Sequence, residues 1–251
     1  MKVKKILVSQ PKPESGKSPF IDLTEKFNVK VDFRPFIKVD PILSREFRDQ
    51  KVNIADHSAI IFTSRSGIEH FFRLAKDLRV PISNELKYFC VSEAIALYLQ
   101  KFILNFRKRK VFYGSTGRLQ DMFTVLKKHT KENFLVVLPD NNNDIILDML
   151  SKSNLEYDIA LMYRTVSNDF EEGEEFNHDM VLFYSPQGIS ALIKNFPDFE
   201  QGERVIGTLG AATAQAAEEA GLRVDIKVPS PQYTSISVAV EAFIKENHKR
   251  R

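Results

Sequence analysis

The sequence contains two similar strand-to-helix turns, AIIFTSRSGIEHFF (Ala59–Phe72) and MVLFYSPQGISALI (Met180–Ile193). In each stretch an apolar run reaches a Phe, a Ser stands two residues later, and a Gly comes three residues after the Ser. An amphipathic stretch then follows. The serines lie 185 − 64 = 121 residues apart, and the glycines lie 188 − 67 = 121 residues apart. A polar turn that recurs about half a chain length later predicts two domains of related plan.

Apolar runs of strand length alternate with helical patterns of about ten residues through the whole chain. This alternation predicts βαβ units, parallel sheets and an α/β fold. The repeat extends past the first pair of turns, because KYFCVSEAIALYL matches RVIGTLGAATAQAA with Ser92 opposite Gly210. The predicted strands are KKILVSQ near the start, AIIFTS at 59–64, KYFCVS at 87–92, KVFYGS at 110–115, NFLVVLP at 133–139, MVLFYS at 180–185, RVIGTLG at 204–210 and RVDIKVP at 223–229.

The two predicted domains are not consecutive in the sequence. VDFRPFIKVDP (Val31–Pro41) and ALMYRTVSN (Ala160–Asn168) read as extended stretches, the first one punctuated by proline. We interpret them as two antiparallel linker strands, at about 33–40 and 160–167. Residues 1–37 and 166–251 then form a discontinuous flavodoxin-like α/β domain, into which a second α/β domain, 41–162, is inserted.

Composition narrows the classes of function. With 251 residues, 43% hydrophobic and 27% charged, the chain is typical of an ordinary soluble globular protein. It has no apolar run near the ~20 residues that a membrane span requires. The net charge of +3 is compatible with an anionic ligand. The sequence has no basic stripe interleaved with aromatic residues, the pattern that would predict nucleic-acid binding. The lone cysteine, Cys90, excludes an intrachain disulfide framework and fits a reducing cytoplasm.

Small hydroxyl residues and glycines follow most of the predicted strands. Each is placed to cap the next helix, and capping alone explains any one of them. Gathered at the carboxyl edges of two parallel sheets, the same groups and nearby helix N-termini would also bind carboxylates or phosphates. The five histidines lack metal-ligand spacing, so we expect no metal site. The candidate binding residues are Thr63, Ser64, Ser92, Ser115, Thr116, Ser185, Gly188, Gly210 and Thr213.

Over nearly its whole length the chain resembles the uroporphyrinogen-III synthase family. The resemblance rests on the order and spacing of short motifs rather than on any single one. They are ILVSQP, IFTSRSGIEHFF, VSEAIA, the linker pair Tyr163 and Thr165, FYSPQG, GAATA, EEAGL and VPSPQYTS. Ser92 and Ile95 depart from the family, which often has Gly and Thr at these two places.

The resemblance implies a monomeric, cytoplasmic enzyme of haem synthesis that uses no metal or cofactor. Its substrate would be linear hydroxymethylbilane, a polycarboxylate that loses water, inverts its last pyrrole ring and closes into a macrocycle. Tyr163 would lie on a linker beside an interdomain cleft, and Ser64 and Ser185 would line opposite walls of that cleft. The phenol of Tyr163 would donate a proton to the leaving hydroxyl of the substrate. The alternative for Tyr163 is a packed strand residue without a catalytic role.

A second class of function is also compatible with the sequence. Two similar α/β lobes on a two-stranded hinge also describe proteins that clamp small anions without chemistry. A two-lobed binding or sensor module is therefore the alternative to the enzyme.

Overall fold

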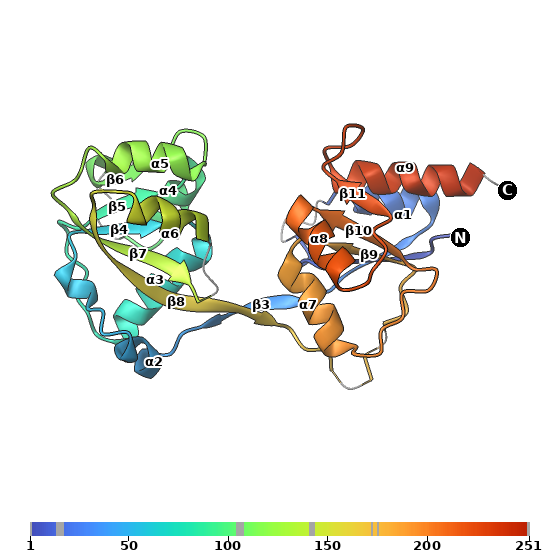
Figure 1. The fold of residues 1–251 in the computed structure, drawn as a ribbon, viewed down its shortest axis with the longest axis horizontal. Helices are drawn as coiled ribbons and strands as arrows, with labels where there is room; N and C mark the ends of the chain where they lie inside the picture. The colour runs from blue at the N-terminus through green and yellow to red at the C-terminus, as the bar shows by residue number, and fades with distance from the viewer. Residues whose placement is uncertain are drawn as a thin grey trace. The chain divides into compact units, whose positions relative to one another are not determined.

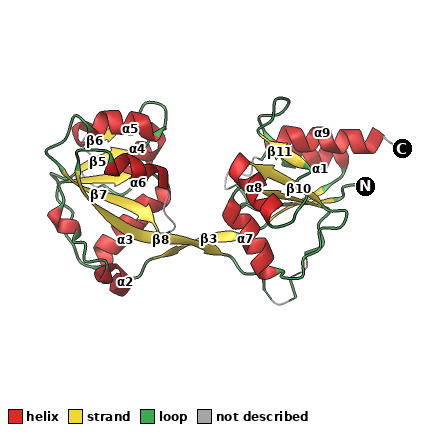
Figure 2. Cartoon of the chain, viewed as in Figure 1, coloured by secondary structure: helices red, strands yellow, loops and turns green. Residues whose placement is uncertain are grey.

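The computed structural model describes residues 2–13, 18–103, 108–140, 144–171, 173–174 and 176–249. The chain divides into two compact units, each a parallel-strand sheet with helices on both faces (Figures 1 and 2). Unit 1 contains Met1–Lys38 and Val166–Arg251, and unit 2 contains Val39–Thr165. The predicted α/β fold with parallel sheets is confirmed. In the described part of the chain, no helix combines the length and apolarity needed to cross a membrane.

Unit 1 has a five-stranded sheet in the order β11-β10-β9-β1-β2, with every neighbouring pair parallel. In chain order this is 2-1-3-4-5, the flavodoxin-like arrangement, whose direction of winding reverses between β1 and β9. Its strands are β1 (Lys5–Val8), β2 (Lys30–Phe33), β9 (Met180–Phe183), β10 (Val205–Leu209) and β11 (Ile226–Val228). Its helices are α1 (Ile21–Phe27), α7 (Pro186–Asn195), α8 (Ala211–Glu219) and α9 (Ile236–Lys249).

Unit 2 has a six-stranded sheet in the order β3-β8-β7-β4-β5-β6. From β8 to β6 the strands are parallel, and the winding reverses between β4 and β7. Its strands are β4 (Ala59–Phe62), β5 (Lys87–Cys90), β6 (Val111–Tyr113) and β7 (Asn133–Pro139), together with β3 (Ile37–Pro41) and β8 (Glu156–Ser167), which both cross the boundary into unit 1. Its helices are α2 (Ser44–Asp49), α3 (Arg65–Asp77), α4 (Glu93–Leu99), α5 (Leu119–Leu126) and α6 (Asp144–Ser151), with 3₁₀ turns at Ile54–Asp56 and Lys108–Lys110.

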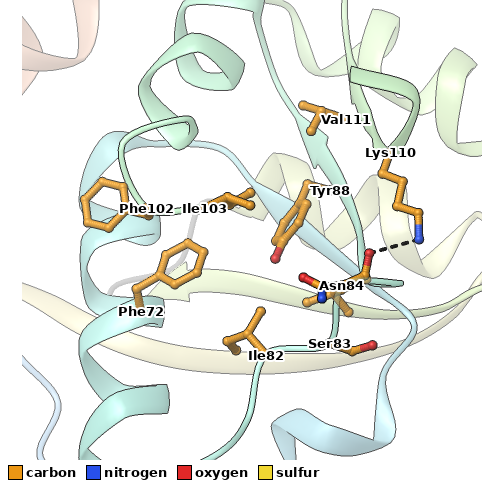
Figure 3. Close-up of a pocket in the computed structure, with 10 residues that line it drawn as sticks. Phe72, Ile82, Ser83, Asn84, Tyr88, Phe102, Ile103, Lys110 and Val111 are labelled. Carbon is orange, nitrogen blue, oxygen red and sulfur yellow. Dashed lines mark hydrogen bonds between the residues drawn. The ribbon is translucent and has the colours of Figure 1, made fainter. Parts of the chain in front are cut away.

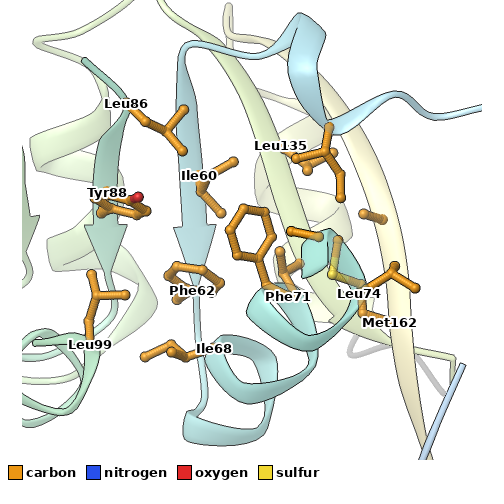
Figure 4. Packing of buried hydrophobic residues seen from close by; sticks show 14 of the residues in the cluster. Ile60, Phe62, Ile68, Phe71, Leu74, Leu86, Tyr88, Leu99, Leu135 and Met162 are labelled. Atoms are coloured by element: carbon orange, nitrogen blue, oxygen red, sulfur yellow. The ribbon is translucent and has the colours of Figure 1, made fainter. Parts of the chain in front are cut away.

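Each sheet is covered on both faces, which is why its strands read as continuous apolar runs. In unit 1, α1 and α9 pack on one face, and α7 and α8 pack on the other. In unit 2, α2, α3 and α4 cover one face, and α5 and α6 cover the opposite one. Figure 4 shows Phe71 of α3 packed against Ile60 and Phe62 of β4, and Leu74 of the same helix beside Met162 of β8.

The stretches that we interpreted as two linker strands contain β3 and β8, which are neighbours in the sheet, and both stretches also contribute to further strand pairs. Within 31–41, residues up to Phe33 belong to β2, which pairs with β1 in the sheet of unit 1. Strand β8 begins at Glu156, and residues from Glu156 to Tyr163 pair with β7. Extended, proline-punctuated sequence predicts strand backbone well, but it does not reveal whether a sheet neighbour is present.

Candidate functional site

Tyr163 and Ser64 meet at the carboxyl edge of the sheet in unit 2. Tyr163 lies on β8 and is only 6% exposed, and its phenol oxygen is 2.8 Å from Ser64 Oγ. Ser64 follows β4, which flanks the point where the winding reverses, the usual place for ligands in open α/β sheets. The two residues are 99 positions apart in the sequence, so the fold alone brings them together.

Ser64 caps the helix that follows it. Its backbone is extended (φ −148°, ψ 162°), and its Oγ accepts a hydrogen bond from the Gly67 N–H at 3.0 Å. The same oxygen therefore connects the N-terminus of α3 with the phenol of Tyr163. Either hydroxyl can donate in the Ser64–Tyr163 bond. When Ser64 donates, the proton of the phenol is free to bond to another molecule.

The phenol of Tyr163 is held in its protonated form. Burial raises the pKa of Tyr163, and the hydrogen bond from Ser64 lowers it only partly. His70, one helical turn after Gly67, stacks on the same ring with 5.4 Å between ring centroids and 16° between ring planes. Sequence reasoning missed His70, although its spacing of three from Gly67 puts both residues on one helix face.

A hollow of about 330 Å³ opens beside Tyr163. Its size is within the range of small-molecule sites. Thr63 and Tyr163 provide hydroxyl-bearing side chains, and Gly117 contributes backbone from the loop before α5. The remaining lining residues are apolar: Val91, Leu119, Leu138, Pro139 and Ile146. Most of this wall comes from the carboxyl ends of β4, β5, β7 and β8, so the pocket is positioned by the sheet.

Ser115 and Thr116 do not cap α5, and that part of the prediction is wrong. The N-cap residue is Arg118, which makes no capping bond with its side chain. Both hydroxyls instead donate to the carboxylate of Asp121, and the Thr116 N–H also donates to it at 3.1 Å. These interactions lower the pKa of Asp121, the bond from the Thr116 side chain most of all. The acidic residue two places into the helix, rather than the helix N-terminus, organises this loop.

In unit 1 the corresponding edge is built around Ser185. Its backbone is extended (φ −155°, ψ 153°), and its Oγ accepts from the Gly188 N–H at 3.2 Å. Ser185 follows β9, which flanks the reversal point of this sheet as β4 does in unit 2. A Cβ placed on Gly188 would lie 4.0 Å from the hydroxyl of Ser9, which follows β1 on the other side of the reversal. The two serines of the repeated turn thus occupy equivalent places in their own sheets.

The other predicted residues show mixed outcomes. Ser92 caps α4 as predicted and accepts from the Ile95 N–H at 3.4 Å. Gly210 begins α8 at φ +93°, a conformation that residues with a side chain rarely adopt. Thr213 lies inside α8 and is 2% exposed, so its predicted capping role is wrong.

A second pocket of unit 2, of about 380 Å³, lies near the starts of β5 and β6 (Figure 3). Phe72 and Phe102 line it together with Tyr88, whose phenol pKa is raised by burial. None of the predicted site residues lies there. Tyr88 is a useful reference for Tyr163, because it is a second buried phenol in the same unit.

Metal-ligating side chains do not cluster in the described parts of the chain. Neither unit has a group of three or more His, Cys, Asp or Glu residues able to hold a metal ion, within those parts. Cys90 is buried on β5, and burial raises the pKa of its thiol to about 12. A thiol in that environment stays protonated and unreactive.

Comparison with known proteins gives one family and one fold. Residues 18–237 match the family described as Uroporphyrinogen-III synthase HemD. The chain is similar to the crystal structure of uroporphyrinogen-III synthetase from Helicobacter pylori, with a TM-score of 0.62 and 14% identity over 97% of this chain and 99% of that one. It is also similar to a mutant uroporphyrinogen III synthase from Thermus thermophilus, with a TM-score of 0.56 and 14% identity over 98% and 99%. No curated protein matches it in sequence. At this identity the structural likenesses show the fold alone.

Proposed function

The chain belongs to the uroporphyrinogen-III synthase family, and from this premise we propose how its residues carry out the reaction. The protein is a cyclising lyase of haem biosynthesis. It converts linear hydroxymethylbilane into uroporphyrinogen III with loss of water and inversion of ring D.

Tyr163 donates the proton that turns the terminal hydroxyl of the substrate into water. The observation that carries this role is the 2.8 Å bond between Tyr163 and Ser64 beside an apolar pocket. Because burial raises the pKa of Tyr163, the phenol carries its proton when the substrate arrives. The carbon–oxygen bond breaks as the hydroxyl takes the proton, and the electron-rich pyrrole keeps the positive charge as an azafulvene cation.

The Ser64 turn stabilises the charge that develops on Tyr163. As the phenol gives up its proton, Ser64 donates a hydrogen bond to the phenolate oxygen. Gly67 N–H bonds to the same Ser64 oxygen, so the positive end of α3 is coupled to the developing charge. Ring D attacks the cation through a spiro intermediate, which fragments and recloses. The proton lost from carbon at ring closure returns to Tyr163, which leaves water as the only by-product.

The apolar wall around Tyr163 protects the cation. Leu119, Leu138 and Ile146 exclude water from a carbon that water would otherwise attack. Exclusion of water and a fixed substrate geometry are effects that lower a barrier without further catalytic groups. The enzyme therefore needs one proton donor and a shaped pocket.

Polar groups at the carboxyl edges of both sheets bind the carboxylates of the substrate. The first N–H groups of a helix have no partner within the helix, and the helix dipole favours an anion there. In unit 2 the proposed groups are Thr63, Ser64, Ser92, Ser115 and Thr116. In unit 1 they are Ser185, Gly188, Gly210 and Thr213, of which Thr213 is buried and can take part only if the start of α8 shifts. Ser115 and Thr116 can take part only if the substrate displaces the carboxylate of Asp121 from their hydroxyls.

We also propose that the enzyme acts in the cytoplasm as a monomer. The single, buried Cys90 suits a reducing compartment, and the monomer follows from the family resemblance. Analytical ultracentrifugation at micromolar concentration tests the oligomeric state, and a dimer would overturn that part.

The isomer of the product tests the function. Freshly generated hydroxymethylbilane is incubated with the protein, and the oxidised uroporphyrins are separated by chromatography. Uroporphyrin III is expected with the protein, and type I in its absence, because the bilane closes spontaneously to type I. Type I alone in the presence of folded protein would overturn the enzyme and favour an anion-binding or sensor module.

A further inference from the structure

His70 stacks on the ring of the catalytic tyrosine in an offset arrangement. Its imidazole lies against the Tyr163 ring with 5.4 Å between centroids and 16° between planes. Ser64, at the start of the same helix, bonds to the hydroxyl of that tyrosine. One helix therefore fixes the Tyr163 side chain at two points, at its oxygen and across its ring.

Gly67 lets α3 come close enough for both contacts. A Cβ on this glycine would lie 3.3 Å from Ser64 Oγ and 3.5 Å from Val137 Cγ1 of β7, the neighbour of β8. The first distance is closer than most real Cβ contacts, so a side chain at this place would crowd the Ser64 hydroxyl that bonds to Tyr163. The spacing of three between Gly67 and His70 turns both toward this side of the helix.

One ring nitrogen of His70 makes no hydrogen bond in the described structure. Nδ1 of His70 is buried and has no hydrogen-bond partner among the described residues. A buried polar atom without a partner destabilises a fold, by roughly 1–3 kcal/mol in general. Burial, together with the nearby Arg73, also lowers the pKa of His70, so the ring stays neutral. The contact that the structure shows for this ring is its stack on Tyr163.

We propose that His70 is a positioning residue for Tyr163. Its flat ring restricts rotation of the phenol and keeps the phenol oxygen at Ser64. The inference rests on the proposed role of Tyr163. It assigns no proton transfer to His70, because in the described structure the hydroxyl of Tyr163 bonds to Ser64 and not to the imidazole.

Two substitutions of His70 distinguish the effect of its flat ring from the effect of its volume. His70→Phe keeps an aromatic face, whereas His70→Leu keeps apolar volume and removes the flat ring, so both variants should fold. We expect His70→Leu to lower kcat about tenfold with KM within about twofold, since small misplacement of a catalytic group costs this much or more. His70→Phe should recover at least about half of the wild-type kcat.

A double-mutant comparison tests whether His70 acts through the phenol. In a Tyr163→Phe background, His70→Leu should change kcat by less than about twofold, because no phenol oxygen is left to position. An equal loss in both backgrounds, or a His70→Phe variant as slow as His70→Leu, would overturn the inference. His129→Ala is the matched control, because His129 is also a half-buried histidine of unit 2 packed on aromatic rings, Phe89 and Phe112. It should lower thermal stability and leave kcat unchanged.

A readout without substrate separates failure of this inference from failure of the function. In protein labelled with ¹³C at the tyrosine ε positions, the Tyr163 signal is identified by its loss in Tyr163→Phe. His70→Leu should shift this signal and speed the ring flips, and His129→Ala should do neither. If wild-type protein makes no type III isomer, the proposed function fails while this measurement still decides the role of His70. An unchanged Tyr163 signal in His70→Leu would contradict the positioning role of His70.

Discussion

The Ser64 turn of unit 2 and the Ser185 turn of unit 1 have nearly the same backbone, with φ of −148° and −155° and ψ of 162° and 153°. In both, the serine oxygen accepts from an N–H three residues ahead, at 3.0 and 3.2 Å. They differ in the second contact. Tyr163 of β8 reaches Ser64, whereas the described residues give Ser185 no second side-chain partner. The repeated turn is therefore a common scaffold, and the chemistry is added by a strand residue that only unit 2 has.

The largest effect expected is for Tyr163→Phe, which makes the unit 2 turn like that of unit 1. Loss of a proton donor typically costs 10²–10⁴-fold, and we expect about 100-fold lower kcat, because the pyrrole itself assists ionisation. Activity should therefore be reduced but not abolished. Steady-state assays of type III formation measure it. The control variant Tyr88→Phe removes another buried phenol of unit 2 and should have the turnover of the wild-type enzyme. Full turnover in Tyr163→Phe would remove Tyr163 from the mechanism.

Gly210→Ser is expected to have the next largest effect, and it acts on stability. Gly210 occupies the place in unit 1 that Ser92 occupies in unit 2, but at φ +93° instead of −148°. A side chain in this region of backbone space costs roughly 1–3 kcal/mol, so we expect about 2 kcal/mol lower free energy of unfolding. Urea titration followed by circular dichroism measures the change. An unchanged midpoint would show that the two turns are interchangeable after all.

Ser64→Ala and Ser185→Ala test the comparison directly. Each removes one capping bond, and each should lower the free energy of unfolding by about 1 kcal/mol. Ser64→Ala also removes the partner of the phenol, so its kcat should fall about tenfold, less than the roughly 10²–10³-fold lost with a donor that bonds to the substrate itself. Ser185→Ala should raise KM and leave kcat nearly unchanged, because we propose only carboxylate binding there. Equal kcat losses in the two variants would contradict the division of roles.

The smallest effect is expected for Ser92→Gly, the reverse of the Gly210 change. Gly is nearly as good an N-cap as Ser, so the free energy of unfolding should fall by only a few tenths of a kcal/mol. Thermal unfolding measured beside Gly210→Ser gives the contrast. A loss as large as that of Gly210→Ser would mean that the Ser92 side chain is needed for more than its capping bond to Ile95.

Much of this architecture was predictable because helix and strand periods are local properties. The parallel α/β fold and the caps at Ser64, Ser92 and Ser185 followed from short stretches of sequence. The pairing of β2 with β1 was missed, because a sheet neighbour cannot be recognised from one extended strand. Asp121 was missed for a related reason, since it competes for the hydroxyls of Ser115 and Thr116 from the following helix.

The site itself was only partly predictable. The motifs drew attention to Ser64 and Tyr163, but their contact joins residues 99 positions apart and depends on the strand order. His70 was passed over, because a single histidine in an amphipathic helix reads as an ordinary packed residue. Its stack on Tyr163 becomes visible only when α3 and β8 are placed in one unit.

The insertion of unit 2 between β2 and β9 also sets the order in which the protein can fold during synthesis. Strand β1 lies between β2 and β9 in its sheet, yet β9 begins 180 − 8 = 172 residues after β1 ends. On the ribosome, β1 and β2 emerge first, and one edge of β1 stays unpaired. All of Val39–Thr165 is translated, and can fold, before β9 is made. Until β9 is made, that edge of β1 has no strand to pair with, and unpaired apolar strand edges favour pairing with other chains.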